Sequence, residues 1–480
     1  TGDLRSIGLM RINTFTDDAL SDLDTVGLKE ALASGRVSAA EVREAAMARA
    51  EAAGRLNAVV TWVEEQNTQD GPFAGIPTFL KDNEDLPGYP TTFGSRAVPR
   101  REAENPTRLV EHWRRLGFDT LGKTALPEFG LTATTEPLDH GPTRNPWGLD
   151  YSVGGSSGGS AAMVAAGVVP IAHANDGGGS IRIPASCCGL VGLKPSRGRL
   201  VDPEAMDQMP VKIVTQGVVT RTVRDTVQFY REMARIHPAD HLPPIGPTGD
   251  PGRLRIGLLT QGVAGLPVDP EVQAAVESAA RLCEDLGHAV EPIDNPFPDQ
   301  IAQDFLRYWA MLAFSLQRFG SQVYGKEYQP KQLEPFTIHL SKFFSSVAVG
   351  LPGSLRRLRR FGPVYDEAFG EFDVILSPVL GTPPVRIGYI GPEVDPREHL
   401  VRLLRFASFT ALQNVSGAPG ISMPMAMSAH GLPIGIHAAG RFGQEQMLLD
   451  LAAAIEQAQP WARIDQVTSS NEWTQEAGHA

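Results

Sequence analysis

Gly154-Gly155-Ser156-Ser157-Gly158-Gly159-Ser160 and Asp176-Gly177-Gly178-Gly179-Ser180-Ile181-Arg182-Ile183-Pro184-Ala185 are two glycine-rich segments that lie close together in the sequence. Glycines allow a backbone to approach a ligand closely and to adopt positive φ. Consecutive N–H groups in such a turn can converge on one anionic point. An acyl-transfer enzyme needs this arrangement beside its nucleophile, because negative charge develops on the carbonyl oxygen. The sequence therefore predicts an oxyanion hole formed by Gly177, Gly178, Gly179 and Ser180.

A serine nucleophile needs a base, and neither glycine-rich segment contains a histidine. His173 lies closest, inside the apolar run 168–174, and we expect it to be a core histidine. Lysine can serve as the base if burial keeps its amino group neutral. Lys81 ends the apolar run 76–80, although a lysine taken alone is usually a surface residue. Its position favours a buried lysine whose pKa is lowered.

The pattern around these segments alternates strands and helices. Buried strands are predicted at 168–174, 253–259, 288–293 and 372–378, and an amphipathic helix at 271–286. This β-α-β rhythm predicts an α/β protein with a parallel or mixed sheet wrapped by helices. Residues 297–361 are mostly helical and aromatic-rich, so we interpret them as an excursion over the core. Residues 410–426 and 433–439 are expected to close the sheet, followed by a helix at 444–458.

The composition excludes several classes of protein. A net charge of −12 argues against a nucleic-acid partner, which needs a basic surface. No apolar run reaches the roughly eighteen residues of a membrane span, and no signal-peptide pattern is visible. The three cysteines lack metal-ligand spacing and are expected to be buried thiols in a reducing cytoplasm. We expect residues 1–9 to be a remnant of upstream sequence outside the fold.

Together these segments resemble the amidase-signature family. The resemblance extends from about Val26 to the end of the chain. The further segments that carry it are Ala74-Gly75-Ile76-Pro77, Leu80-Lys81-Asp82, Gly122-Lys123-Thr124, Thr143-Arg144-Asn145-Pro146-Trp147, Cys188-Gly189-Leu190-Val191-Gly192-Leu193-Lys194-Pro195, Asn414-Val415-Ser416-Gly417-Ala418-Pro419-Gly420 and Gly431-Leu432-Pro433-Ile434-Gly435. This resemblance implies one amidase-signature domain over residues 10–480, with a large mixed sheet covered by helices on both faces.

The resemblance also implies a catalytic triad. Ser180 would be the nucleophile, Ser156 would follow a cis peptide and relay the proton, and Lys81 would be the base. Ser157 would hydrogen-bond within this network.

Asp176 and Arg182 would brace the glycine loop as a charge pair. Many members have threonine or another small residue where this chain has Gly177, and we expect the glycine to open room near the scissile bond. The family implies neither a metal nor an organic cofactor, and either a monomer or a homodimer.

The substrate is expected to be a small molecule. The pattern is similar to bacterial amidases that accept aryl amides or nylon-type amides, and to urethane-cleaving members, so an amide, an ester or a carbamate would fit the reaction. Arg199 follows the second segment and is a candidate for orienting a ligand. The aromatic residues of 297–361 would favour aryl or alkyl groups if they line the pocket.

Three other interpretations remain open. Gly154 to Gly158 formally matches the G-x-S-x-G motif of an α/β-hydrolase esterase, with Ser156 as nucleophile and His288, His339 or His437 as base. A subunit of a tRNA-dependent amidotransferase, which takes ammonia from glutamine, belongs to the same family. A non-enzymatic phosphate-binding scaffold is the third, although the glycine segments lack the P-loop pattern.

Overall fold

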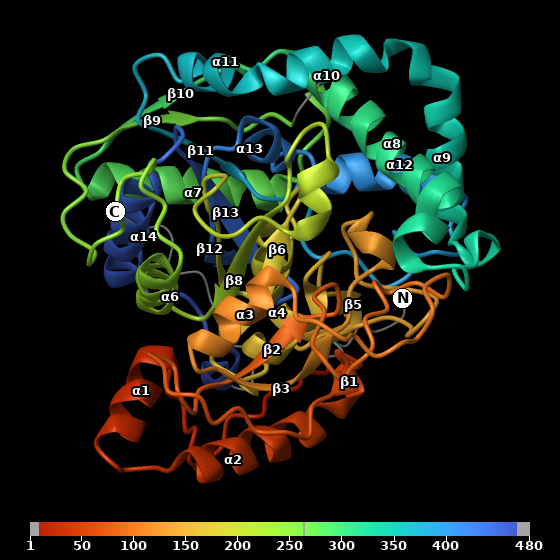
Figure 1. Ribbon diagram of the computed structural model, residues 1–480. Coiled ribbons are helices and arrows are strands. Elements are labelled where there is room, and N and C mark those ends of the chain that lie inside the picture. Colours follow the sequence, from red (N-terminus) through yellow and green to blue (C-terminus); the bar gives the residue numbers. More distant parts are fainter. Residues whose placement is uncertain (1–8, 263–264, 468–480) are drawn as a thin grey trace, which may run out of the picture.

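A large mixed sheet forms the centre of the computed structural model, which describes residues 9–262 and 265–467 (Figure 1). Its strands are β6 (Ile171–Asp176), β7 (Val191–Lys194), β8 (Thr215–Thr220), β9 (Arg255–Leu258), β10 (Ala289–Pro292), β11 (Val374–Pro378), β12 (Gly420–Met427) and β13 (Pro433–Ala439). The spatial order is β10-β9-β11-β13-β12-β7-β8-β6. Neighbours are parallel from β10 to β11 and antiparallel from β11 to β6. The predicted mixed sheet is confirmed.

A second, three-stranded sheet lies beside β6. It has the order β1-β3-β2, with bounds β1 (Val59–Trp62), β2 (Pro77–Lys81) and β3 (Asp119–Thr124). The hydroxyl of Thr78 in β2 donates to the carbonyl of Ile171 in β6, at 2.9 Å. A small hairpin of β4 (Arg144–Asn145) and β5 (Gly148–Ser152) stands apart. The contact between β2 and β6 places Lys81, the last residue of β2, against the large sheet.

Helices cover both faces of the large sheet. On one face lie α6 (Val223–Ile236), α7 (Pro270–Asp285) and α14 (Glu445–Ala458), as Figure 1 shows. The short helix α5 (Arg182–Cys188) packs on the other face. There a Cβ on Gly435 of β13 would lie 2.6 Å from Cβ of Ser186, so only glycine fits at this approach. The helix α4 (Gly158–Ala165) packs against β6 and β2.

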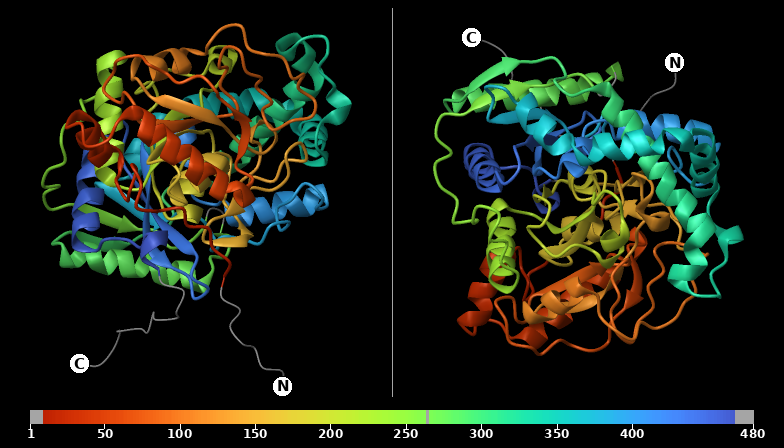
Figure 2. Two further views of the ribbon diagram at one scale, coloured as in Figure 1. Left: turned by 90° about the horizontal axis from the view of Figure 1, so that it is seen from below. Right: turned by 45° about the horizontal axis from the view of Figure 1, so that its top comes forward.

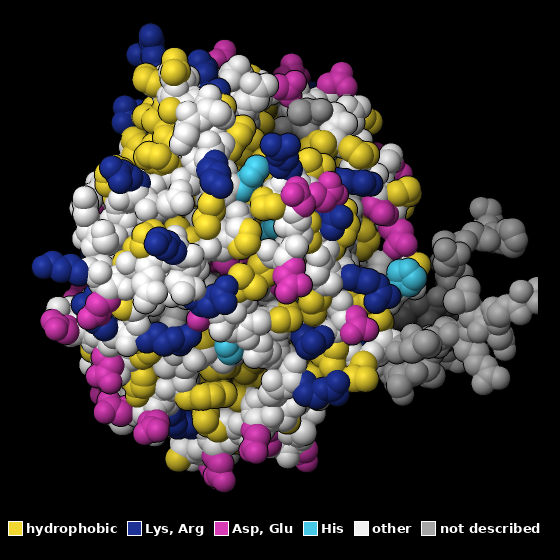
Figure 3. Space-filling view, turned by 90° about the vertical axis from the view of Figure 1, so that its right-hand side faces the viewer, with side chains coloured by type: hydrophobic (Ala, Val, Ile, Leu, Met, Phe, Trp, Pro, Cys, Tyr) yellow, Lys and Arg dark blue, Asp and Glu magenta, His cyan; other side chains and the backbone are white. Residues whose placement is uncertain are grey.

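The remaining helices lie at the two ends of the molecule. The N-terminal helices are α1 (Thr25–Ala33), α2 (Ala39–Ala52) and α3 (Arg108–Arg115). The predicted excursion consists of α8 (Asp299–Tyr324), α9 (Pro335–Val347), α10 (Leu351–Arg359) and α11 (Phe361–Ala368), followed by α12 (Pro396–Phe406) and α13 (Ala411–Ser416). Figure 2 (right) shows the N-terminal helices at the bottom and the excursion across the top. In Figure 3, hydrophobic side chains are scattered among charges of both signs on the side where α8, α9 and α12 lie.

Local sequence signals explain where several helices begin. Ser38 and Glu41 form a capping box at the start of α2, because each side chain binds the other residue's backbone N–H. Gly35, with φ of +70°, separates α1 from α2. Asp269 caps α7 and Pro270 occupies its first turn.

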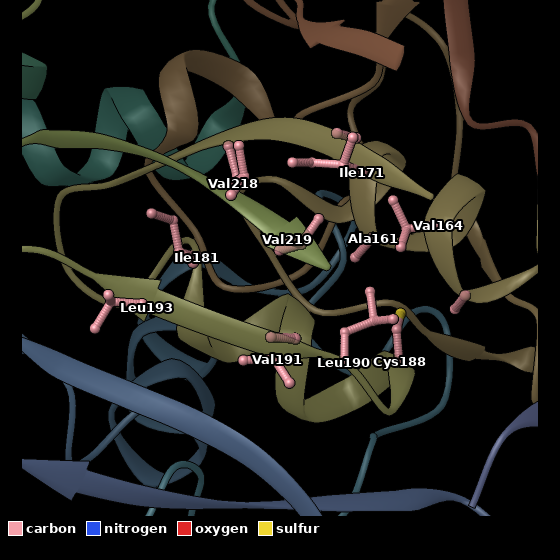
Figure 4. Close-up of a cluster of buried hydrophobic side chains, with 14 of the residues drawn as sticks. Ala161, Val164, Ile171, Ile181, Cys188, Leu190, Val191, Leu193, Val218 and Val219 are labelled. Carbon is pink, nitrogen blue, oxygen red and sulfur yellow. The ribbon is translucent and has the colours of Figure 1, made fainter. Parts of the chain in front are cut away.

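The core around the two glycine-rich segments is apolar and closely packed. Figure 4 shows Val164 of α4, Ile171 of β6, Val191 of β7 and Val218 of β8 gathered in one cluster. The loop before α4 carries Ser156, and the loop between β6 and α5 carries Ser180. This core therefore fixes both serine-bearing loops against one rigid body.

Two buried helices, α5 and α13, were not predicted from the sequence. Residues 410–426 do not form one strand, because residues 411–416 are the helix α13 and only 420–427 form β12. All seven residues of α5 are buried, and so are five of the six in α13. A helix without a solvent-facing side has no 3.6-residue polarity pattern to detect.

Two further predictions concern the N-terminal residues 1–9 and the three cysteines. Of residues 1–9, only Leu9 lies within the described residues, and it packs against a cluster that contains Trp147. Cys187, Cys188 and Cys283 are free and buried, as predicted. Burial raises the pKa of all three thiols.

Candidate active site

Lys81 places its amino group beside the serine of the first glycine-rich segment. Lys81 Nζ lies 2.8 Å from Ser156 Oγ and 2.7 Å from Asn175 Oδ1. The side chain is only 1 % exposed, and this burial lowers the pKa of Lys81 to about 7, although the charges of Asp176 and Glu84 act in the opposite direction. An amine with a pKa near 7 is partly unprotonated at neutral pH. Lys81 can therefore accept a proton from Ser156.

Asn175 is a residue of the site that the sequence analysis missed. It lies on β6 two residues after His173, so both side chains point to the same face of the strand. His173 Nδ1 accepts the backbone N–H of Lys81 at 3.2 Å. The signal was available, because His173 and Asn175 are polar positions with period two among the apolar residues Ile171, Ala172 and Ala174 of β6. Together they hold the backbone and the amino group of Lys81.

His173 itself is a core histidine, as predicted. It is fully buried, and burial lowers its pKa to about 3, so the ring is neutral. Since Nδ1 accepts from Lys81, Nε2 carries the proton and donates to Gln216 Oε1 at 3.0 Å. Both ring nitrogens are thus engaged away from Ser156 and Ser180.

The peptide bond between Gly155 and Ser156 is cis. Residues 130–133 pack directly against it: a Cβ on Gly130 would lie 3.0 Å from Ser156 Oγ, and one on Gly155 would lie 2.9 Å from the carbonyl carbon of Ala133. Ser157 donates its backbone N–H to the carbonyl of Ser180 at 3.3 Å. Its hydroxyl oxygen lies 3.3 Å from the carbonyl oxygen of Asn175. These contacts join the loop of Ser156 to the loop of Ser180.

Asp176 and Arg182 meet at the base of the second glycine-rich segment. Arg182 binds both carboxylate oxygens of Asp176, at 2.9 and 3.0 Å, and both side chains are fully buried. Burial alone would raise the pKa of Asp176, but the charge and hydrogen bonds of Arg182 hold it well below its usual value. The carboxylate also accepts the N–H groups of Gly179 at 2.7 Å and Ile181 at 3.1 Å. The pair fixes the backbone on both sides of Ser180.

The amides of the glycine loop divide into two groups. Gly179 N–H is bound to Asp176, whereas the amides of Gly177, Gly178 and Ser180 donate no hydrogen bond within the described part of the chain. Gly179 has φ of +133°, and a Cβ there would lie 2.3 Å from Thr410 Oγ1, so only glycine fits. A Cβ on Gly177 would lie 3.1 Å from Val214 Cγ2, a tight approach, and 3.9 Å from the ring of Trp309, an ordinary contact. The glycine at 177 therefore makes room for neighbouring side chains.

A cavity of about 290 Å³ opens over Ser180, Gly178 and Gly155. Among the described residues, no Asp, Glu, Lys or Arg lines it. Its other walls are Gly130, Leu131, Thr132, Ala133, Ile183, Leu266, Ala302, Gln303, Phe305, Leu306, Trp309, Leu400, Leu403, Leu404, Ala407, Ser408, Phe409, Ala411, Leu412 and Val415. Such a pocket suits an uncharged, largely apolar ligand.

The excursion contributes only some of its aromatic residues to this cavity. Phe305 and Trp309, one turn apart on α8, line it. Tyr308 points the other way, is fully buried and donates its hydroxyl to the carbonyl of Val211 at 2.7 Å. Phe314, Phe344 and Tyr324 pack against other aromatic rings.

Arg199 does not lie at the cavity. It is buried in an ion pair with Glu445, with contacts of 2.8 and 3.0 Å, and it also donates to the carbonyl of Pro243. The prediction that it orients a ligand is not supported, because its guanidinium anchors α14.

Across residues 9–262 and 265–467, no cluster of three His, Cys, Asp or Glu side chains could hold a metal ion. No helix in these ranges is long and apolar enough to span a membrane.

Comparisons with known proteins agree with this fold. The sequence model of the amidase family matches residues 34–449. A putative amidase AmiC of Mycobacterium leprae is 46 % identical over 466 residues, covering 95 % of this chain and 99 % of the relative. Two solved structures are similar. A 6-aminohexanoate cyclic dimer hydrolase complexed with substrate has a TM-score of 0.83 at 32 % identity, covering 92 % of this chain and 98 % of its own. A bacterial aryl acylamidase has a TM-score of 0.78 at 29 % identity, covering 92 % and 96 %.

These similarities extend over nearly the whole chain and include the segments that carry the site. They define a hydrolase that acts on amide C–N bonds. The chain belongs to the amidase family.

Proposed function

We propose that this chain hydrolyses uncharged, hydrophobic amides, with Ser180 as nucleophile, Ser156 as proton relay and Lys81 as base. The observation that carries the proposal is the 2.8 Å contact between Lys81 Nζ and Ser156 Oγ, on a buried lysine whose pKa is lowered to about 7. Ser180 opens onto the cavity, while Ser156 lies behind it in a loop that is bonded to the loop of Ser180.

The proposed reaction follows from the order of these groups, with Ser180 at the cavity, Ser156 behind it and Lys81 beside Ser156. Ser180 Oγ attacks the amide carbonyl carbon while its proton passes to Ser156, whose own proton passes to Lys81. The free amides of Gly177, Gly178 and Ser180 support the proposal that these groups bind the resulting oxyanion. Gly179 would contribute by holding the loop through Asp176.

Breakdown of the intermediate uses the same relay in reverse. Protonated Lys81 returns a proton through Ser156 to the leaving nitrogen, the C–N bond breaks and the amine departs. Water then attacks the acyl-enzyme and gives up its proton along the relay. The carboxylic acid leaves, and Ser180 is restored.

The cavity supports a substrate without charge. Its wall is apolar apart from Thr132, Gln303, Ser408 and Ser180, and no charged side chain among the described residues lines it. An aryl amide or a nylon-type amide fits this wall, in line with the names of the two structural neighbours. Carbamates and esters present the same carbonyl to Ser180, so we propose them as slower additional substrates.

The alternatives are less well supported. An α/β-hydrolase needs a histidine on its nucleophile, yet Ser156 Oγ contacts Lys81, and His437 lies beside Arg182. Glutamine carries an ammonium and a carboxylate, and among residues 9–262 and 265–467 the cavity wall offers no opposite charge to bind them. A non-enzymatic scaffold leaves the buried lysine unexplained.

A panel assay with matched serine variants tests the proposal. Wild type, Ser180→Ala and the exposed control Ser346→Ala are compared on an aryl amide, an aryl carbamate, an aryl ester and glutamine. We expect the aryl amide to be cleaved fastest, Ser180→Ala to lose roughly 10³-fold or more of kcat, and Ser346→Ala to match wild type. Full activity of Ser180→Ala, or a preference for glutamine, would contradict the proposal.

A further inference from the structure

Thr132 is one of the few polar side chains on the cavity wall. It belongs to residues 130–133, which pack against the cis peptide, with Gly130 next to Ser156 Oγ and Ala133 next to Gly155. In the proposed reaction, Ser156 delivers the proton to the leaving nitrogen. A group bound to Thr132 is therefore held on the side of the cavity where the leaving group departs.

A buried histidine fixes the direction of the Thr132 hydroxyl. His399 Nδ1 lies 3.2 Å from the carbonyl oxygen of Gly391, which can only accept, so Nδ1 carries the ring proton. The ring is 2 % exposed and stacks on Phe336 at 3.9 Å between centroids. Burial lowers the pKa of His399 to about 4, so the ring is neutral and Nε2 holds only a lone pair.

The hydroxyl must therefore donate its proton to His399. Thr132 Oγ1 lies 2.8 Å from His399 Nε2, and an unprotonated nitrogen can only accept. The proton of Thr132 then points at the histidine, and its oxygen offers only lone pairs to a ligand. The neighbouring carbonyl of Leu131 already accepts the indole N–H of Trp309, at 3.2 Å.

We infer that Thr132 is a specificity-determining residue, which accepts a hydrogen bond from the N–H of the scissile amide and so selects amides over esters. This inference rests on the proposed function. When the C–N bond breaks, the nitrogen must turn its lone pair toward Ser156, and an N–H held by Thr132 fixes that orientation. An ester oxygen has no proton, and its lone pairs would face those of Thr132.

Paired substrates test this role. The 4-nitroanilide, the N-methyl-4-nitroanilide and the 4-nitrophenyl ester of one acyl group differ only at the leaving atom. In Thr132→Val, which keeps the shape and removes the hydroxyl, we expect kcat/KM for the anilide to fall about tenfold, as for one lost hydrogen bond. The ester and the N-methyl anilide are expected to change less than threefold.

Thr132→Ser is the matched control, because it keeps the hydroxyl, and it should retain the preference of wild type. An equal fall on all three substrates in Thr132→Val would show a packing role and overturn the inference, as would an unchanged rate on the anilide. If wild type cleaves the ester and neither anilide, the proposed amidase function fails as well, which separates that failure from an error about Thr132 alone. Melting temperatures of the variants confirm that each remains folded.

Discussion

At the scale of single residues, the proposed chemistry depends on the amino group of Lys81, which burial keeps partly unprotonated. Two opposing influences set its pKa: desolvation lowers it, and the charges of Asp176 and Glu84 raise it. Asn175 adds an uncharged acceptor 2.7 Å from Nζ, which orients the amine without binding a proton of its own. A change of charge at any of these positions should therefore alter the pH at which the enzyme works.

The pH dependence of wild type follows directly. In the proposed mechanism the active form has Lys81 unprotonated, and the pKa of this amino group, about 7, lies below the ordinary 10.5 of lysine. We expect kcat/KM for an aryl amide to fall about tenfold per pH unit below pH 7 and to level off above it. Lys81→Met should abolish activity at every pH, because the base is missing. A rate that stays constant from pH 5 to 9 would contradict the assignment.

Asn175→Asp tests the role of the uncharged acceptor. A carboxylate 2.7 Å from Nζ would stabilise the ammonium form, so the pH–rate limb should move upward by about 1–3 units. Activity at pH 7 would be low and would recover toward pH 9. The same change at exposed Asn13 serves as control and should leave the pH profile of wild type. A loss of activity at every pH in Asn175→Asp would argue for disruption of the site rather than for retuning of Lys81.

At the scale of elements, the sequence predicted those helices and strands that have a recognisable pattern of apolar residues. The helices α7 and α14 were predicted because each has a solvent-facing side, and the central strands because they are apolar runs. The helices α5 and α13 were missed because almost every residue in them is buried. The motif serines and Lys81 could be named from resemblance. His173 and Asn175 stand out as polar positions in β6, but only the contact between β2 and β6 brings them to Lys81, and no local pattern specifies that contact.

Glu334, the residue just before α9, makes the free energy of unfolding depend on pH. Burial, followed by the charge of Glu128, raises the pKa of Glu334 to about 8, although its carboxylate accepts the N–H of Leu138 at 2.7 Å. Because the unfolded chain loses this proton near pH 4.5 and the folded chain near pH 8, stability falls across that window. The slope approaches about 1.4 kcal/mol per pH unit.

Glu334→Gln removes this titration. We expect its urea unfolding free energy to decline less between pH 5 and 8 than that of wild type. Glu327→Gln, at an exposed glutamate nearby in the chain, is the control and should follow wild type. Parallel declines in wild type and Glu334→Gln would show that Glu334 does not carry the effect.

At the scale of the whole molecule, the site is assembled from two sheets. Lys81 comes from the three-stranded sheet, whereas Ser156 and Ser180 come from loops around the large sheet. Arg49 of α2 helps to join the N-terminal layer to the body. It is 3 % exposed, binds both carboxylate oxygens of Asp18 and donates to the carbonyl of Gly167 after α4.

Replacement of Arg49 should loosen this junction. Arg49→Met leaves Asp18 and several carbonyls without their donor, and we expect a loss of about 3 kcal/mol in unfolding free energy. Arg36→Met, at an exposed arginine between α1 and α2, should cost less than about 0.5 kcal/mol. Chemical denaturation of both variants, followed by activity, measures the difference. Equal stability of the two variants would contradict the anchoring role of Arg49.

The uncharged cavity wall also has a consequence for the end of the catalytic cycle. At neutral pH the acid product ionises, and an aliphatic amine product takes up a proton, since their pKa values are about 4 and above 10. Each product therefore acquires a charge for which the described residues of the wall offer no partner. Product release is favoured, and accumulated products compete poorly with fresh substrate. The enzyme should keep turning over in concentrated mixtures of its own products, and it should be a poor catalyst of amide synthesis from the ionised acid and amine.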